Sequence, residues 1–199
     1  YLNGIYIHKH DKKLIAVATD GHRLARTSIS LPSGADLISG VIIPRKAIYE
    51  IRKLIEDYSN DEQVYVSLSD SKIRVKISNT IITSKLIDGN FPDYEKVIPK
   101  DNANIVNLDC LVFSESVDRV STIFSDKSKS VRLSLSANKL SLEANSPDTG
   151  SASEEIEITY DKDDISIGFN SRYLLDVTSQ IGSGDLIMAL KDSGSPALI

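Results

Sequence analysis

Three stretches of the chain align with one another without a gap, and they constrain the fold more than any other feature. They are IYIHKHDKKLIAVATD from Ile5, VYVSLSDSKIRVKISN from Val64 and VRLSLSANKLSLEANS from Val131. Each contains an alternating apolar and polar run, a polar turn with lysine at the ninth position, and a second alternating run. Such alternation between polar turns is typical of β-hairpins. A weaker fourth copy begins at Leu186, so the sequence predicts repeated antiparallel hairpins.

Amphipathic segments between the hairpins predict three helices. IPRKAIYEIRKLIEDY places Pro44 at a first helical position, CLVFSESVDRVSTIF begins at Cys110, and NSRYLLDVTSQIG has an Asn170 or Ser171 cap and stops at Gly182. Their apolar faces are expected to include Ile48, Ile51, Leu54, Ile55, Val112, Ser116, Val117 and Val120. The predicted fold class is α+β, with repeated helix-plus-antiparallel-strand units. The polar stretch 99–104 is expected to link two such domains, 1–103 and 104–199.

Composition and charge exclude several classes of protein. One cysteine, Cys110, excludes an internal disulfide framework and favours a cytoplasmic compartment. The apolar runs are too short for a transmembrane helix, so no membrane partner is expected. A net charge of −5 argues against a generally basic DNA-binding surface. Because the chain opens directly at a predicted strand and stops inside another, we expect it to be a piece of a longer protein.

The stretch TDGHR, Thr19 to Arg23, is the strongest candidate for chemistry, and it has three interpretations. Asp20 and His22 could form an acid/base pair, since histidine titrates near neutral pH. Asp-Gly is also a dipeptide that strongly favours a hairpin turn. In this second interpretation His22 and Arg23 are exposed side chains without a functional role. The third interpretation is a recognition surface. No P-loop, nucleophile elbow or dinucleotide fingerprint accompanies the stretch.

Two further features carry weaker signals. His8 and His10 share one face of a predicted strand with Tyr6, which could bind a metal. We favour the interpretation that these two histidines lie on a solvated strand face. We therefore expect no bound metal, and we expect no cofactor. The helix after Pro44 carries four cations opposite its apolar stripe, which suits either a solvated surface or a phosphate-facing element. These cations are Arg45, Lys46, Arg52 and Lys53.

Six motifs resemble one known family. They are YLNG (1–4), VATDGHRLA (17–25), IIPRKAI (42–48), SKLIDGNFPDY (84–94), VRLSLS (131–136) and IGFNSRYLLDV (167–177). Their order and spacing are similar to those of the bacterial DNA polymerase III beta subunit, the sliding clamp. The resemblance covers essentially the whole chain. It implies the DNA-clamp fold, with helices on the inner face of a ring and sheets outside.

By this resemblance, 1–103 is an N-terminally truncated middle clamp domain. Residues 104–199 are a C-terminal clamp domain without its final strand, and the first clamp domain is absent. The family's function implies a non-catalytic processivity factor that encircles duplex DNA as a head-to-tail homodimer. It also implies short-peptide partners: the DNA polymerase III alpha subunit, the clamp loader and repair proteins.

The resemblance further implies a peptide-binding pocket between the middle and last domains, with apolar walls and polar anchors. The matching residues are Leu2, Thr19, Gly21, His22, Arg23, Leu24, Pro92, Asp93, Lys96, Val97, Asn170, Tyr173, Gly194 and Pro196. Two of them depart from the family pattern. Lys96 stands where arginine is frequent, which loses planar stacking and forked hydrogen bonding, and Pro196 stands where a small polar residue occurs.

The implied DNA channel comprises Tyr1, Arg45, Lys46, Arg52 and Lys53, and the implied dimer interface includes Thr122 and Ile123. Two alternatives remain open at this point. One is a small hydrolase that uses Asp20 and His22. The other is a plain DNA-binding domain, which would bind linear duplex with a steep salt dependence.

Overall fold

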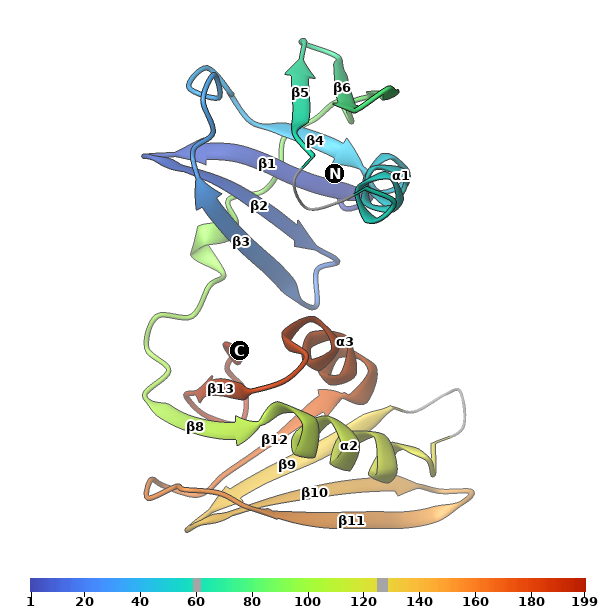
Figure 1. Ribbon diagram of the computed structural model, residues 1–199. Coiled ribbons are helices and arrows are strands. Elements are labelled where there is room, and N and C mark those ends of the chain that lie inside the picture. The colour runs from blue at the N-terminus through green and yellow to red at the C-terminus, as the bar shows by residue number, and fades with distance from the viewer. Residues whose placement is uncertain (59–61, 125–128) are drawn as a thin grey trace. The chain divides into compact units, whose positions relative to one another are not determined.

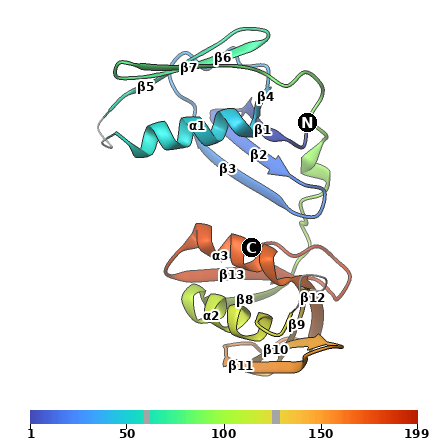
Figure 2. The same ribbon diagram turned by 90° about the vertical axis from the view of Figure 1, so that its right-hand side faces the viewer.

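The computed structural model describes residues 1–58, 62–124 and 129–199. The chain divides into two compact units, Tyr1–Asp93 (unit 1) and Tyr94–Ile199 (unit 2). Figures 1 and 2 show twisted antiparallel sheets in both units, with helix α1 against the sheets of unit 1 and helices α2 and α3 against the sheet of unit 2. The observed fold is therefore α+β, which confirms the predicted class.

Unit 1 contains two sheets and one helix within its described residues. A four-stranded sheet has the order β3-β2-β1-β4, and a three-stranded sheet has the order β5-β6-β7. Helix α1 packs on β1 and β4 of the first sheet and on β6 and β7 of the second. The elements are β1 (Gly4–His10), β2 (Lys13–Thr19), β3 (Leu24–Ser30), β4 (Val41–Pro44), α1 (Arg45–Glu56), β5 (Val64–Leu68), β6 (Lys72–Ile77) and β7 (Thr80–Lys85).

Unit 2 is built in the same way, but two of its helices pack against each other. Its four-stranded sheet has the order β11-β10-β9-β12, and β13 pairs with β8. The elements are η1 (Tyr94–Lys96), β8 (Asn104–Asp109), α2 (Cys110–Ser121), β9 (Ser130–Ser136), β10 (Lys139–Ser146), β11 (Gly150–Glu157), β12 (Ile165–Asn170), α3 (Ser171–Ile181) and β13 (Asp185–Leu190).

The three aligned stretches all fold as hairpins: β1–β2, β5–β6 and β9–β10. The lysine at the ninth position begins the second strand in every copy, at Lys13, Lys72 and Lys139. The fourth copy is only partly a hairpin. After β13 the chain returns to a single antiparallel bridge between Ala189 and Leu198.

The three predicted helices are present, with small differences at their ends and faces. Pro44 is the N-cap of α1 instead of its first helical residue. Asn170 caps α3, accepting from the Arg172 N–H at 3.0 Å, and Gly182 ends this helix with φ +78°. Ile55 and Val112 are 47% and 45% exposed, so the prediction that they face the core was wrong. Ala47 and Phe113 are buried in α1 and α2.

The two four-stranded sheets have the same register around their central strands. Tyr6 on β1 stands opposite Val17 on β2 and Ile42 on β4. In unit 2, Arg132 on β9 stands opposite Glu143 on β10 and Gly168 on β12. These two trios lie on the sheet face that does not carry the main core, which we call the outer face. Equivalent positions can therefore be compared directly.

The main core of each unit lies between the sheet and the helices. In unit 2 it is extensive and includes Phe113, Leu133, Leu142 and Met188. In unit 1 it is smaller and centres on Ile43, Ala47, Ile73, Val75 and Ile77. None of the helices described in residues 1–58, 62–124 and 129–199 combines the length and apolar character that a bilayer crossing requires.

Candidate functional site

The TDGHR stretch forms the turn that joins β2 to β3, and its own side chains fix its shape. Thr19 Oγ1 donates to the Arg23 carbonyl at 2.7 Å and accepts from the Gly21 N–H at 3.1 Å. Asp20 Oδ1 accepts from the N–H groups of His22 and Arg23, each at 3.0 Å. Gly21 adopts φ +87°, a conformation that favours glycine. The turn therefore presents His22 and Arg23 on a rigid, exposed loop.

The carboxylate of Asp20 is committed to this turn. Its Oδ2 also accepts from Arg23 Nε at 3.1 Å. Burial acts to raise the pKa of Asp20, but the His22 and Arg23 hydrogen bonds and the Arg23 charge together hold the pKa below its ordinary value of 3.8. A carboxylate with these contacts is a weak base near neutral pH, so the geometry disfavours an Asp20–His22 acid/base pair.

A second predicted segment, 88–97, follows β7 and ends in the short helix η1. Its start is held by an antiparallel bridge in which the Ile87 N–H donates to the Ile42 carbonyl at 2.9 Å. Pro92 and Asp93 are exposed after this bridge. Beyond η1, Val97 is 61% exposed, although its N–H donates to the Tyr94 carbonyl at 3.1 Å. Exposed apolar side chains such as that of Val97 are suited to apolar recognition.

A second aspartate turn, which the sequence analysis missed, holds the segment that contains Gly194 and Pro196. Asp192 Oδ1 accepts from the N–H groups of Gly194 (2.9 Å) and Ser195 (2.8 Å), and its Oδ2 accepts from Ser195 Oγ. These hydrogen bonds lower the pKa of Asp192. The motif Asp-Ser-Gly-Ser is a typical Asx-turn signature and could have identified it.

Asn102 also holds this segment, and nothing in the local sequence signals that role. Its Nδ2 donates to the carbonyls of Ala189 and Pro196, both at 2.9 Å. Its Oδ1 is buried and has no hydrogen-bond partner among the described residues. The backbone at Pro196 is thereby tied to β13 within unit 2.

The remaining predicted pocket residues are distributed over both units. In unit 1, Leu24 pairs with Thr19 across the turn and Leu2 is 47% exposed. In unit 2, Asn170 caps α3 and Tyr173 lies half-buried in the same helix. Lys96, in η1, is exposed. Unit 1 thus contains the predicted pocket residues of the turn 19–24 together with Leu2, Pro92 and Asp93, and unit 2 contains the others.

The predicted cations of α1 are exposed but partly neutralised. Arg52 Nε donates to Glu56 Oε1 at 2.7 Å, which raises the pKa of Arg52. The Lys53 ammonium lies 4.5 Å from the centre of the Tyr49 ring. For Arg45 and Lys46, no ion pair is found in the described ranges 1–58, 62–124 and 129–199. Arg45 and Lys46 are therefore the cations of this helix that are most available to a phosphate backbone. The remaining predicted DNA-channel residue, Tyr1, is 52% exposed, and its ring contacts that of Phe91.

The other predicted sites have simple local structures. Thr122 caps α2, with Oγ1 donating to the Arg119 carbonyl at 2.7 Å, and Ile123 packs on the unit 2 core. His10 pairs with Asp11 at 3.6 Å. His8 is half-buried and stacked on Tyr6, so its predicted solvated position was wrong. Within the described part of the chain, no group of three His, Cys, Asp or Glu side chains could hold a metal.

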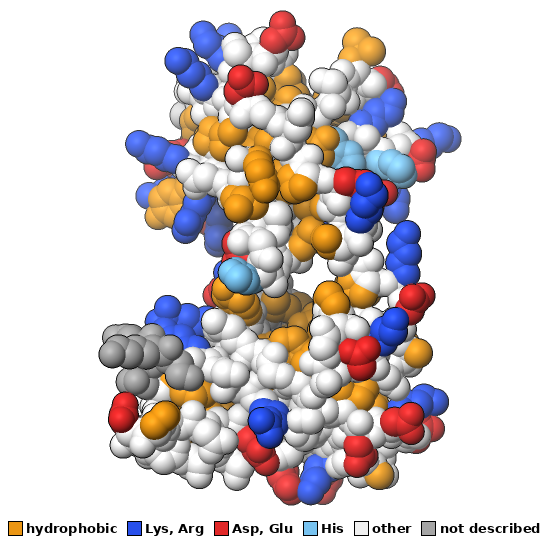
Figure 3. Space-filling view, turned by 180° about the vertical axis from the view of Figure 1, so that it is seen from behind, with side chains coloured by type: hydrophobic (Ala, Val, Ile, Leu, Met, Phe, Trp, Pro, Cys, Tyr) orange, Lys and Arg blue, Asp and Glu red, His pale blue; other side chains and the backbone are white. Residues whose placement is uncertain are grey.

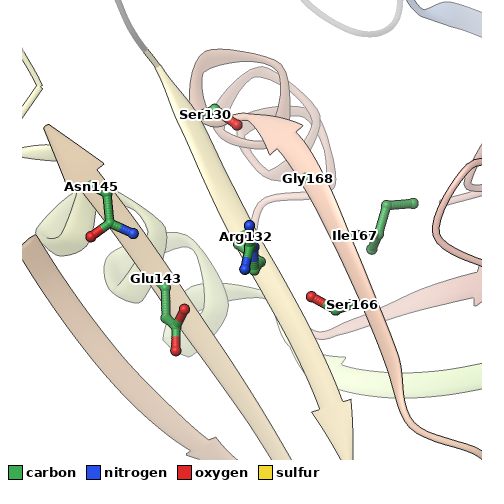
Figure 4. Close-up of a pocket in the computed structure, with 7 residues that line it drawn as sticks. All are labelled: Ser130, Arg132, Glu143, Asn145, Ser166, Ile167 and Gly168. Carbon is green, nitrogen blue, oxygen red and sulfur yellow. The ribbon is translucent and has the colours of Figure 1, made fainter.

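Unit 2 also contains a hollow that no sequence pattern predicted. It has a volume of about 450 Å³ and lies on the outer face of the four-stranded sheet. Figure 4 shows Arg132 between the strand of Glu143 and the strand of Gly168, which has no side chain to fill the space. Ile167 points away from the other labelled side chains.

Comparison with known proteins places this architecture among proteins of DNA replication. The family model "DNA polymerase III beta subunit, central domain" matches residues 1–93, and the model for the C-terminal domain of the same subunit matches residues 95–199. The beta sliding clamp of Caulobacter vibrioides is 46% identical over 203 residues, covering 100% of this chain and 54% of the relative. That of Escherichia coli K12 is 36% identical over 200 residues, with the same coverage.

Solved structures give the same result. A sliding clamp from Bartonella birtlesii, crystallised with bound griselimycin, matches with a TM-score of 0.95 and 47% identity, covering 99% of this chain and 54% of that chain. A Caulobacter crescentus clamp matches with a TM-score of 0.95 and 46% identity, covering 100% of this chain and 53% of that chain. This chain spans about half the length of the curated relatives it matches.

Proposed function

This chain belongs to the DNA polymerase III beta subunit family, and on that premise we propose that it works as part of a sliding clamp. In this role it is a non-catalytic, cytoplasmic processivity factor that holds partner proteins on duplex DNA. The observation that carries the proposal is the match of the two domain models, in order, to residues 1–93 and 95–199.

The proposed activity is recognition of short peptides. By the family resemblance, the residues proposed to recognise the peptide lie in the turn 19–24, the segment 92–97, the start of α3 and the turn 194–196. Leu2, Leu24, Pro92 and Val97 supply apolar surface, and His22 and Arg23 supply polar contacts. The two aspartate turns support this assignment, because rigid loops lose less conformational entropy on binding than mobile ones.

The proposed partners follow from the same role. The DNA polymerase III alpha subunit, the clamp loader and repair proteins would each bind through a short linear peptide. The complete protein would form a head-to-tail homodimeric ring, with Thr122 and Ile123 at the subunit contact. Because griselimycin is bound to the Bartonella birtlesii relative, we propose that this chain binds it too and that it competes with the peptides.

The proposed contact with DNA is weak and independent of sequence. Arg45 and Lys46 face the phosphate backbone, assisted by Arg52, Lys53 and Tyr1. A ring holds DNA by topology, so strong electrostatic attraction is unnecessary. The net charge of −5 and the Arg52–Glu56 ion pair are consistent with weak binding.

A peptide titration tests the proposal. A synthetic peptide that ends in Leu-Phe should bind this chain with a micromolar Kd, equivalent to about −8 kcal/mol, in isothermal titration calorimetry. His22→Ala and Pro92→Ala should each weaken binding, and griselimycin should displace the peptide. A chain that fails to bind the peptide at millimolar concentration does not have the proposed pocket.

The same protein can be tested against the two alternatives. If the chain were a hydrolase, the unaltered chain would hydrolyse a model ester and the Asp20→Asn variant would not. We expect neither the unaltered chain nor the variant to hydrolyse the ester. A plain DNA-binding domain would bind linear duplex at physiological salt with a steep salt slope. We expect weak binding, and tight, salt-sensitive binding would favour that alternative over the clamp.

A further inference from the structure

Four aromatic rings from three segments of unit 1 form one continuous stack. Tyr6 lies parallel to Phe91, with ring centres 4.8 Å apart, and parallel to His8, with centres 4.9 Å apart. Tyr1 contacts the edge of Phe91 at 6.0 Å. We call Tyr1, Tyr6, His8 and Phe91 the aromatic stack. Hydrophobic side chains gather on the face of unit 1 seen in Figure 3, next to histidine side chains.

The strand register explains why these rings lie on an apolar surface. Tyr6 stands opposite Val17 and Ile42, and His8 stands opposite Ile15. Ile15 and Val17 are 0% exposed and Ile42 is 2% exposed, although none of the three belongs to the main core of unit 1. The outer face of this sheet is therefore a second, smaller apolar layer that includes the aromatic stack.

Tyr6 is the central ring of this layer and is constrained on several sides. Its two faces contact His8 and Phe91. Its hydroxyl lies against Gly40, where an added Cβ would come within 2.5 Å of that oxygen. A ring with so many fixed neighbours has few alternative rotamers, so it offers Phe91 a single position.

The position of Phe91 bears directly on the proposed pocket. Segment 88–93 is held at its start by the bridge between Ile87 and Ile42, and Phe91 provides a second attachment through Tyr6. Pro92 and Asp93 follow Phe91 immediately in the sequence. The direction in which the chain leaves the stack therefore determines where these two residues lie.

Unit 2 shows that the fold itself does not require the stack. The position equivalent to Tyr6 is Arg132, and its neighbours Glu143 and Gly168 leave the polar hollow of Figure 4. A sheet with the same strand order and register thus forms with no aromatic ring at this position. The rings of unit 1 have to be explained by something other than the topology of the sheet.

We propose that Tyr6 and His8 are positioning residues for peptide recognition: they hold Phe91, which in turn places Pro92 and Asp93 in the pocket. This inference rests on the proposed function. Without the stack, segment 88–93 would adopt several conformations. The apparent affinity for the peptide would then fall in proportion to the fraction of molecules in which this segment has the conformation that binds the peptide. Aromatic pairs contribute about 0.5–1.5 kcal/mol each, which corresponds to a loss of roughly 2- to 12-fold in affinity.

The test compares Tyr6→Leu with Tyr6→Phe in calorimetric titrations with the peptide that ends in Leu-Phe. Tyr6→Leu removes the ring and should weaken binding by up to roughly 12-fold, whereas Tyr6→Phe keeps the ring and should leave affinity close to that of the unaltered chain. The matched control is Tyr65→Leu, an exposed tyrosine on β5, which should leave affinity unchanged. Phe91→Leu gives a second, independent way to remove the contact.

A fluorescent reporter separates positioning from loss of stability. The chain contains no tryptophan, so Phe91→Trp introduces a single emitter into the stack. Adding Tyr6→Leu to this variant should shift its emission to longer wavelength while the far-UV circular dichroism spectrum is retained.

The outcomes are distinct. Unchanged peptide affinity in both Tyr6→Leu and Phe91→Leu overturns this inference and leaves the proposed function intact. Equal losses in Tyr6→Leu and Tyr6→Phe also overturn it, since the ring is then not the cause. Failure of the unaltered chain to bind the peptide overturns the proposed function, and this inference with it.

Discussion

The outer faces of the two four-stranded sheets have the same backbone and opposite chemistry. In unit 1 the face contains buried Ile15, Val17 and Ile42 together with the aromatic stack. In unit 2 the equivalent positions hold Ser141, Glu143 and Gly168 around Arg132. The register is identical, so the difference comes only from side chains. The same strand register therefore accommodates an apolar outer face in unit 1 and a polar one in unit 2.

A second difference lies on the helix side. In unit 2, α2 and α3 pack together over an extensive core, with Phe113 1% exposed. In unit 1, α1 is the helix described, and its core is smaller. Unit 1 therefore depends more strongly on its outer apolar layer than unit 2 does. The following predictions test that dependence.

The largest contrast is expected between Ile15→Ala and Ser141→Ala, which occupy equivalent positions opposite His8 and Ser134. Ile15 is 0% exposed, so its truncation should leave a cavity and lower the free energy of unfolding by about 2–5 kcal/mol. Ser141→Ala should change it by less than about 0.5 kcal/mol. Urea-dependent hydrogen exchange in the β1–β2 and β9–β10 peptides measures each unit separately. Equal effects would contradict the two-layer description of unit 1.

A smaller contrast is expected between two glycines. Gly40 has φ +102°, and a Cβ there would meet the Tyr6 hydroxyl, so Gly40→Ala should destabilise unit 1 by about 1–3 kcal/mol. Gly168 lies in a strand, and a Cβ there would be 3.6 Å from Ser130 Oγ, an ordinary contact. Gly168→Ala should leave unit 2 unchanged or slightly more stable. Hydrogen exchange measured at increasing temperature gives the stability of each unit in both variants. A Gly40→Ala variant as stable as the unaltered chain would show that the Tyr6 ring is not confined.

The smallest effect concerns the aspartate turns, which the two units share. Asp20→Ala and Asp192→Ala each remove a carboxylate that accepts two backbone hydrogen bonds, and each should slightly lower the stability of its own unit. Because the folded pKa of each carboxyl is lowered, its contribution is complete above the ordinary value of 3.8 and is lost as the pH falls through the folded pKa. Urea titrations should show a larger loss of stability at pH 7 than at pH 2.5. The same cost at both pH values would contradict the assignment.

Local patterns made the hairpins and helices predictable. Alternation around Lys13, Lys72 and Lys139 depends only on neighbouring residues, as do the Asn170 cap and the Gly182 stop. The turn at Asp20-Gly21 was predictable for the same reason. The pairing of β3 was harder to predict, because nearly all of Leu24–Ser30 is exposed and its apolar pattern is weak.

Contacts between distant residues were not predictable from these patterns. Asn102 donates to Ala189 and Pro196, which lie 87 and 94 positions away. His8 looked solvated because the aromatic stack to which it belongs is completed by Phe91, in another segment. The sequence motifs located the candidate pocket segments, but they could not reveal what holds those segments in place.

The proposed function depends above all on recognition of a short peptide by the predicted pocket residues. Titration of the ¹⁵N-labelled chain with the peptide that ends in Leu-Phe, followed by amide chemical shifts, tests this most directly. We expect the amides of Gly21, His22, Val97 and Gly194 to shift together along one micromolar binding curve. Shifts confined to one unit, or centred on Arg132 and Gly168, would contradict it.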